Sequence, residues 1–173
     1  MDDEQTKAGF LDRFFWIIVY FFGIAIVIPI VAGVLAGIKA GAMVGFIFSM
    51  FALQAIAAPL GVPLGLSPPQ ILFVMAFFGI GIILAVYEIC QTLGTSSRRV
   101  AGFIDKIRQK TEKYPWLSKY GSVSCFLIVW IPGIGLYGTP VISWLLSWKR
   151  IPSIIFTFAG FMSGCFFFLY LAS

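Results

Sequence analysis

Very few residues in the apolar part of this chain could take part in chemistry. Glu88 is the one acidic residue within its long apolar stretches, and Arg98 and Arg99 follow it closely. A carboxylate within a bilayer is a functional candidate, because its charge is costly there unless it is paired or neutralised. Glu88 is therefore predicted either to carry a proton or to form an ion pair with the two arginines near the membrane surface.

A second set of candidates surrounds two breaks in the apolar sequence. Residues 131–140 read Ile-Pro-Gly-Ile-Gly-Leu-Tyr-Gly-Thr-Pro, and prolines and glycines oppose a regular helix. Unpaired backbone groups are costly in lipid, so such a break needs cover from protein or water. We predict a substrate pathway formed by residues around both breaks: Gln54, Pro59, Pro132, Gly133, Gly135, Tyr137, Gly138 and Thr139. The alternative is that the polar side chains among them only satisfy the broken backbone and bind nothing.

No pattern of an enzyme or a metal site accompanies these residues. The chain has no histidine, and Cys90, Cys125 and Cys165 stand singly among apolar residues, as buried structural thiols do. Paired carboxylates, a serine–histidine arrangement and a phosphate-binding loop are all missing from the sequence. We therefore expect a protein that is not an enzyme and that holds no metal and no cofactor.

The composition indicates a small multi-pass membrane protein. Of the 173 residues, 60% are hydrophobic and 11% are charged, and the mean hydropathy is +1.00. The chain starts Met1-Asp2-Asp3-Glu4, which is acidic where a secretory signal would be basic. Most of the net charge of +5 falls in one loop, so we expect lipid as the partner and no nucleic acid.

The uncharged stretches divide into crossings and hairpins in an all-α membrane domain. The predicted order is a cytoplasmic tail 1–13, a transmembrane helix 14–38, a re-entrant broken hairpin 41–66, a transmembrane helix 70–91, a basic cytoplasmic loop 92–119 with an amphipathic helix, a second re-entrant hairpin 120–148, and a transmembrane helix 151–172. Pro29 is expected to kink or end the first helix. The uncharged run 40–87 is too long for one helix, and its turn is expected in the proline- and glycine-rich stretch 58–69.

Four glycines near the end of the first crossing recur every four residues. Gly33, Gly37, Gly41 and Gly45 would form a row of small side chains on one helical face. Such rows allow close helix packing in lipid, and this one is a candidate contact in a homodimer.

The two hairpin-plus-helix units look like an inverted repeat. Residues 69–76 align with 152–159, and at the same offset Gly81 matches Gly164 and Tyr87 matches Tyr170. The basic loop belongs in the cytoplasm, which puts the N-terminus inside and the C-terminus outside. The hairpins then enter from opposite sides, as in many secondary transporters.

Both hairpin sequences resemble a known family. Residues 58–67 are similar to the Ile-Pro-Leu-Gly-Ile-Ala-Leu-Gly-Leu-Ser signature of the small multidrug export proteins. Residues 131–139 resemble their Pro-Gly-Thr-Gly-Ala-Trp-Thr-Gly pattern, with Ile134 for its threonine and Tyr137 for its tryptophan. Leu53 and Ala55 stand where the family carries an acidic and a basic residue, which argues against proton coupling at this hairpin. The layout is also similar to the DedA/VTT (SNARE-associated) superfamily, which implies paired re-entrant hairpins and lipid movement.

Together these features predict a small transporter-like protein of the cell membrane. We expect export of a hydrophobic or amphipathic small molecule, because few charges would line the pathway. One alternative is a DedA-like lipid flippase or scramblase, and another is a non-transporting membrane organiser that docks a partner through the basic loop. A homodimer is expected, because one small copy has little bulk to enclose a pathway.

Overall fold

The computed structural model describes residues 14–96, 102, 115–131 and 134–171, and every regular element in these ranges is a helix. The predicted all-α class is therefore confirmed. Four segments are long and apolar enough to cross a membrane by length and composition: Phe14–Leu35, Ala40–Gly61, Pro68–Gly94 and Arg150–Leu171. The chain is thus built as a multi-pass membrane protein. The amphipathic helix expected in the basic loop falls largely outside the described residues.

The first helix changes its hydrogen-bond pattern along its length. Its middle is a π-helix, η1 (Val19–Val27), which continues without a break into α2 (Ile28–Leu35). The N–H of Ile28 binds the C=O of Gly23, five residues back, as a π-helix requires. Pro29 stands at the start of α2, where the pattern changes and a missing donor is tolerated. The helix therefore passes Pro29 instead of ending there.

The glycine row does not form one helical face, and that prediction was wrong. Gly37 has a φ of 84°, and the chain turns there from α2 into α3 (Ala40–Leu53). Gly33 is buried against α3, where an added Cβ would lie 2.5 Å from the Sδ of Met43. At Gly41 and Gly45 no atom of another element lies within 4 Å of such a Cβ. Of the four glycines, Gly33 provides the close helix contact, and it does so between α2 and α3.

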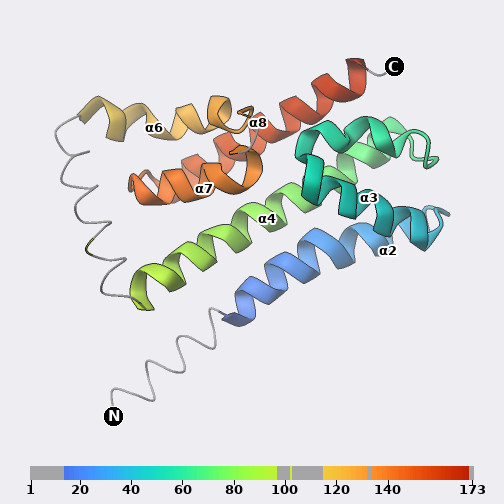
Figure 1. Cartoon of the computed structure of the whole chain (residues 1–173), viewed down its shortest axis with the longest axis horizontal. Coiled ribbons are helices and arrows are strands. Elements are labelled where there is room, and N and C mark those ends of the chain that lie inside the picture. Colours follow the sequence, from blue (N-terminus) through green and yellow to red (C-terminus); the bar gives the residue numbers. More distant parts are fainter. Residues whose placement is uncertain (1–13, 97–101, 103–114, 132–133, 172–173) are drawn as a thin grey trace, which may run out of the picture.

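The first hairpin reverses at Gln54, and the turn predicted in the run 58–69 follows at residues 62–65, before α4. α3 ends at Leu53, Gln54 takes a φ of 54°, and the chain returns as a 3-10 helix, η2 (Gln54–Gly61). Figure 1 shows α3 and the returning arm side by side, and the arm leads back to the end of the molecule where α3 begins. The run 58–69 forms the end of the returning arm and its link to α4 (Pro68–Ser96).

The second hairpin consists of α6 (Pro115–Ile128) and α7 (Gly135–Leu145), which pack on each other. Figure 1 shows that α7 brings the chain back to the end of the molecule where α6 begins. A tight turn closes α7: Ser147 has a φ of 56°, and the N–H of Trp148 binds the C=O of Ser143 at 2.9 Å. α8 (Arg150–Leu171) follows and runs back across the molecule.

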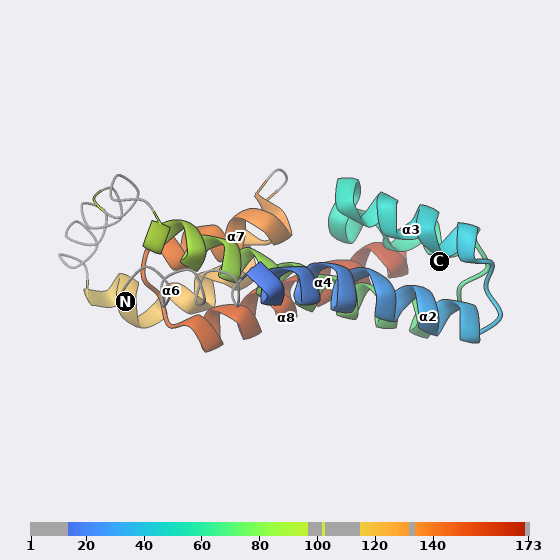
Figure 2. The ribbon, with the colours of Figure 1, turned by 90° about the horizontal axis from the view of Figure 1, so that it is seen from below.

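The two long helices α4 and α8 pack on each other and run in opposite directions (Figure 1), and Figure 2 shows them crossing near the middle of the molecule. The returning arm of each hairpin packs on the long helix of the other unit, η2 on α8 and α7 on α4. At Gly79 of α4 an added Cβ would lie 2.7 Å from the ring of Phe161 of α8, so the helices approach closely. Figure 2 shows the elongated result, with α3 toward one end and α6 and α7 toward the other. The tips of the hairpins therefore face each other at mid-length.

A candidate substrate site between the hairpin tips

The two hairpin tips meet through Gln54 and the first turn of α7. The Oε1 atom of Gln54 accepts a hydrogen bond from the N–H of Leu136 at 2.8 Å, across 82 positions of sequence. Gly135, with a φ of 41°, lies directly under this side chain, and a Cβ there would collide with Oε1 and lie 2.8 Å from Cδ. Glycine is thus required at 135 by both backbone conformation and space.

A second hydrogen bond joins the tips in the opposite direction. The hydroxyl of Tyr137 donates to the C=O of Phe51 in the last turn of α3 at 3.0 Å. Helix ends leave their first N–H and last C=O groups without intrahelical partners. Gln54 therefore satisfies the start of α7, and Tyr137 satisfies the end of α3.

The other residues predicted for the pathway lie close by. Thr139 is buried and donates to the C=O of Gly135 at 2.6 Å, within its own helix. Gly138 packs under the side chain of Ile134, and Pro59 lies half-buried in η2. Pro132 and Gly133 lie outside the described residues. The side chains of Gln54 and Tyr137 thus serve the broken backbone, whereas Thr139 bonds within α7; Gln54 also borders open space.

That space is a cavity of about 260 Å³ beside the tips. Its wall combines both tips with the middle of α8: Ala52, Leu53, Gln54, Ala55, Ile56, Val129, Trp130, Ile131, Gly160, Phe161, Gly164 and Phe168. Leu53, Ile56, Trp130 and Ile131 are exposed, so the cavity opens on the outer surface of the helix bundle at mid-length. Apart from the Gln54 amide, its described walls are apolar or aromatic.

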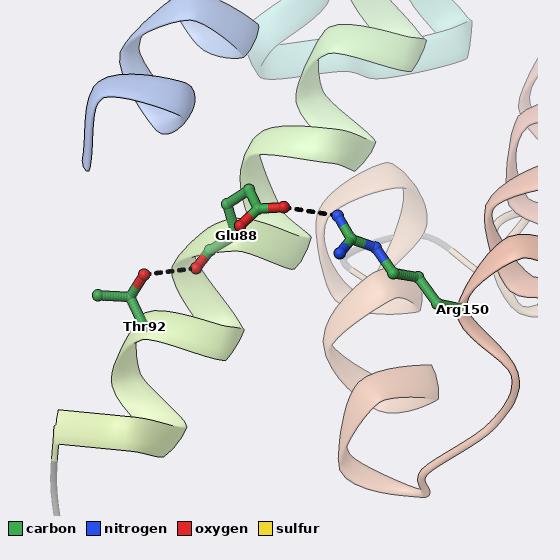
Figure 3. Close-up of polar contacts among 3 residues, drawn as sticks. All are labelled: Glu88, Thr92 and Arg150. Atoms are coloured by element: carbon green, nitrogen blue, oxygen red, sulfur yellow. Dashed lines mark hydrogen bonds and ion pairs between the residues drawn. The ribbon is translucent and has the colours of Figure 1, made fainter. Parts of the chain in front are cut away.

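Glu88 forms an ion pair at one end of the molecule, as Figure 3 shows. Its Oε1 lies 2.6 Å from an Nη of Arg150 at the start of α8. The carboxylate side chain is 13% exposed and the arginine 40%, and the guanidinium carbon lies 5.7 Å from the ring centre of Tyr87. Thr92 donates to the C=O of Glu88 at 2.8 Å. Arg98 and Arg99, the partners considered from sequence, lie outside the described residues.

A buried polar cluster next to this pair was missed by sequence reasoning. The hydroxyl of Tyr87 hydrogen-bonds that of Ser143, which donates to the C=O of Pro140 at 3.0 Å. Ser153 of α8 donates to Ser122 of α6 at 3.2 Å, and both are buried. The available signal was the spacing of Ser153 and Thr157, one turn apart on an otherwise apolar helix, which places two hydroxyls on one face.

Comparison with known proteins shows the family of the chain. A family described as "Putative small multi-drug export protein" matches residues 54–167, which is more than half of the chain. The matched range begins at Gln54, the turning point of the first hairpin, and ends within α8, so it leaves the first helix outside. No curated protein matches the chain, and no solved structure does. The similarity in layout to the DedA superfamily stays a prediction.

Proposed function

The chain belongs to the small multidrug export protein family, and on that premise we propose that it is a transporter that exports hydrophobic or amphipathic small molecules across the cytoplasmic membrane. The observation that carries the proposal is the cavity between the tips. It lies at mid-length, where broken helices from two units meet, and this is where many secondary transporters bind substrate. Its apolar wall with a single amide suits a substrate that is mostly hydrocarbon or aromatic.

We further propose that the two hairpins are re-entrant and form inverted repeats. Support comes from the reciprocal packing of η2 on α8 and of α7 on α4, and from the opposite directions of the two long helices. The charges support one orientation. Lys149 and Arg150 lie with the second hairpin, whereas Lys39 lies at the opposite end between α2 and α3. By the positive-inside rule the second hairpin would open to the cytoplasm, with the N-terminus inside and the C-terminus outside.

Lipid movement is a second candidate function. The cavity opens on the outer surface of the helix bundle. The exposed residues at its rim, Leu53, Ile56 and Ile131, lie on the surface that lipid or a second copy would cover. A lipid chain could enter such an opening directly from the bilayer. In the homodimer that we also propose, the second copy would close this side and complete the pathway.

Reconstitution into liposomes separates these functions. We expect the purified protein to move an amphipathic dye, rhodamine 123, across the membrane in response to an ion gradient. Movement of fluorescent phospholipid without any gradient would support the lipid candidate instead. If neither moves, and a deletion phenotype maps to residues 98–119, the organiser interpretation replaces transport.

Two variants test whether the pathway lies at the tips: Gly135→Val changes the tips, and Gly41→Ala is the control. The first places a branched side chain against Gln54, and should abolish flux by separating the tips. The second adds a methyl group where space is free, and should leave flux unchanged. Equal flux in both variants would contradict a pathway at the tips.

A further inference from the structure

We propose that the cavity selects apolar substrates that carry a hydrogen-bond acceptor, and that the Nε2 group of Gln54 is the donor that recognises it. This inference rests on the proposed function and deepens it, because it names the substrate class of the same site. Two features support it: the orientation of the Gln54 amide and the groups around that amide.

The amide of Gln54 can be oriented in one way only. A backbone N–H donates and never accepts, so the atom that binds the N–H of Leu136 must be the oxygen. This removes the usual ambiguity between the oxygen and nitrogen of a glutamine side chain. Nε2, with its two N–H donors, is left over, and no described residue accepts a hydrogen bond from it.

Among the described residues that line the cavity, no side chain accepts a hydrogen bond from Nε2. The described residues that line the cavity carry no carboxylate and no basic group, and most are aliphatic or aromatic. A hydrocarbon bound there would leave the donors unpaired in an apolar setting, which is costly. A primary ammonium group would find no carboxylate to pair with among the described residues that line the cavity. A ketone, ester or ether oxygen would accept from Nε2 while the rest of the molecule fills the apolar wall.

The backbone also favours a binding role for Gln54. Its φ of 54° and ψ of −126° lie in a region that residues other than glycine rarely adopt. The contacts of the tips hold the residue there, with its amide between Gly135 and the cavity. The cavity, at about 260 Å³, has room for a compound of two or three fused rings or for part of a lipid chain.

Binding of two matched probes tests the inference. 9-Fluorenone carries one carbonyl acceptor, and fluorene has nearly the same shape without it. Equilibrium dialysis against the full-length protein in nanodiscs, corrected with empty nanodiscs, gives the ratio of their affinities. We expect the wild type to prefer fluorenone about 5- to 10-fold, the ratio that one net hydrogen bond provides.

Three variants test whether the amide of Gln54 causes this preference for fluorenone. Gln54→Met keeps the length of the side chain without the amide, and should bring the ratio to about 1 while fluorene still binds. Tyr170→Phe also removes one hydroxyl, but at an exposed residue that does not line the cavity, so its ratio should equal that of the wild type. Ala52→Phe fills the cavity from its exposed side and should weaken binding of both probes.

A wild-type ratio near 1, an unchanged ratio in Gln54→Met, or an equal loss in Tyr170→Phe would overturn the inference. Binding of both probes at wild-type strength in Ala52→Phe would also overturn the inference. This test remains available if Gln54→Met cannot be purified. Flux of rhodamine 123 in liposomes is measured separately. Flux without a preference for fluorenone removes this inference alone, whereas the preference without flux keeps the binding site and removes the proposed transport.

Discussion

Replacing Gly135 with alanine should destabilise the protein through the contact between the hairpin tips. Two costs can be worked out from the structure. A residue with a Cβ at a φ of 41° pays about 1–2 kcal/mol for the left-handed conformation. The new Cβ also collides with Oε1 of Gln54 and displaces the acceptor from the buried Leu136 N–H, which costs about 1–3 kcal/mol. Gly135→Ala should therefore lose about 2–5 kcal/mol of unfolding free energy.

A double-mutant cycle separates the two costs. Unfolding free energies are measured by reversible denaturation with SDS in mixed micelles, for Gly135→Ala, Gln54→Ala and the double variant. With Gln54→Ala in place the collision is absent and the hydrogen bond is already lost. Gly135→Ala should then cost only the conformational term of about 1–2 kcal/mol, leaving a coupling of about 1–3 kcal/mol.

Gly41→Ala is the control, because it lies on α3 with free space around its Cβ position. It should change stability by less than about 0.5 kcal/mol or raise it slightly, since alanine favours a helix. If Gly135→Ala costs the same with and without Gln54, the tips do not touch, and the reasoning about the cavity between them fails.

Two further predictions concern the charged residues. Arg150→Gln leaves a mostly buried carboxylate unpaired and should cost about 2 kcal/mol or more of unfolding free energy, whereas Glu88→Gln leaves an arginine that can reach water and should cost about 1 kcal/mol or less. The reverse order in the same micelle assay would contradict the described burial. Cysteines placed singly at Lys119 and Lys149 should react with an impermeant maleimide from the same side of the membrane, and a cysteine at Lys39 from the other. Labelling of the first two from different sides would make the second hairpin an ordinary span.

The sequence was informative about the tips because polar groups are so scarce there. The sequence singles out Gln54 and Tyr137, because a broken backbone in lipid needs partners and few side chains nearby can supply them. The structure joins both residues to backbone groups of the opposite hairpin. Their further role in a substrate pathway stays a prediction, and the probe and flux experiments address it.

The position of the first turn could not be found in this way. Residues 53–55 read Leu-Gln-Ala, and neither glycine nor proline marks the reversal at Gln54. The backbone conformation there depends on contacts with Gly135 and Leu136, which lie more than eighty positions away. Turn signals in the run 58–69 belong to the returning arm and its link to α4.

The regular spacing of the glycine row predicts the wrong structure for a related reason. A period of four places residues on one face only while the helix continues. At Gly37 the N–H bonds back to the C=O of Val34, and that of Ile38 to the C=O of Gly33, which is the bond pattern that ends a helix. The same glycine that extends the row in sequence therefore ends the helix in the structure.

The two units match in layout but differ in how firmly they are held. Tyr87 is buried and hydrogen-bonds Ser143, whereas Tyr170, its counterpart in the sequence alignment, is 80% exposed. Side-chain hydrogen bonds and an ion pair thus tie the second hairpin and the start of α8 to their neighbours. Among the described residues no side-chain hydrogen bond joins η2 to α8, because beyond Gln54 this arm is entirely apolar. Apolar contacts slide more easily than buried hydrogen bonds break, so η2 is held less firmly on α8 than the second hairpin is on α4.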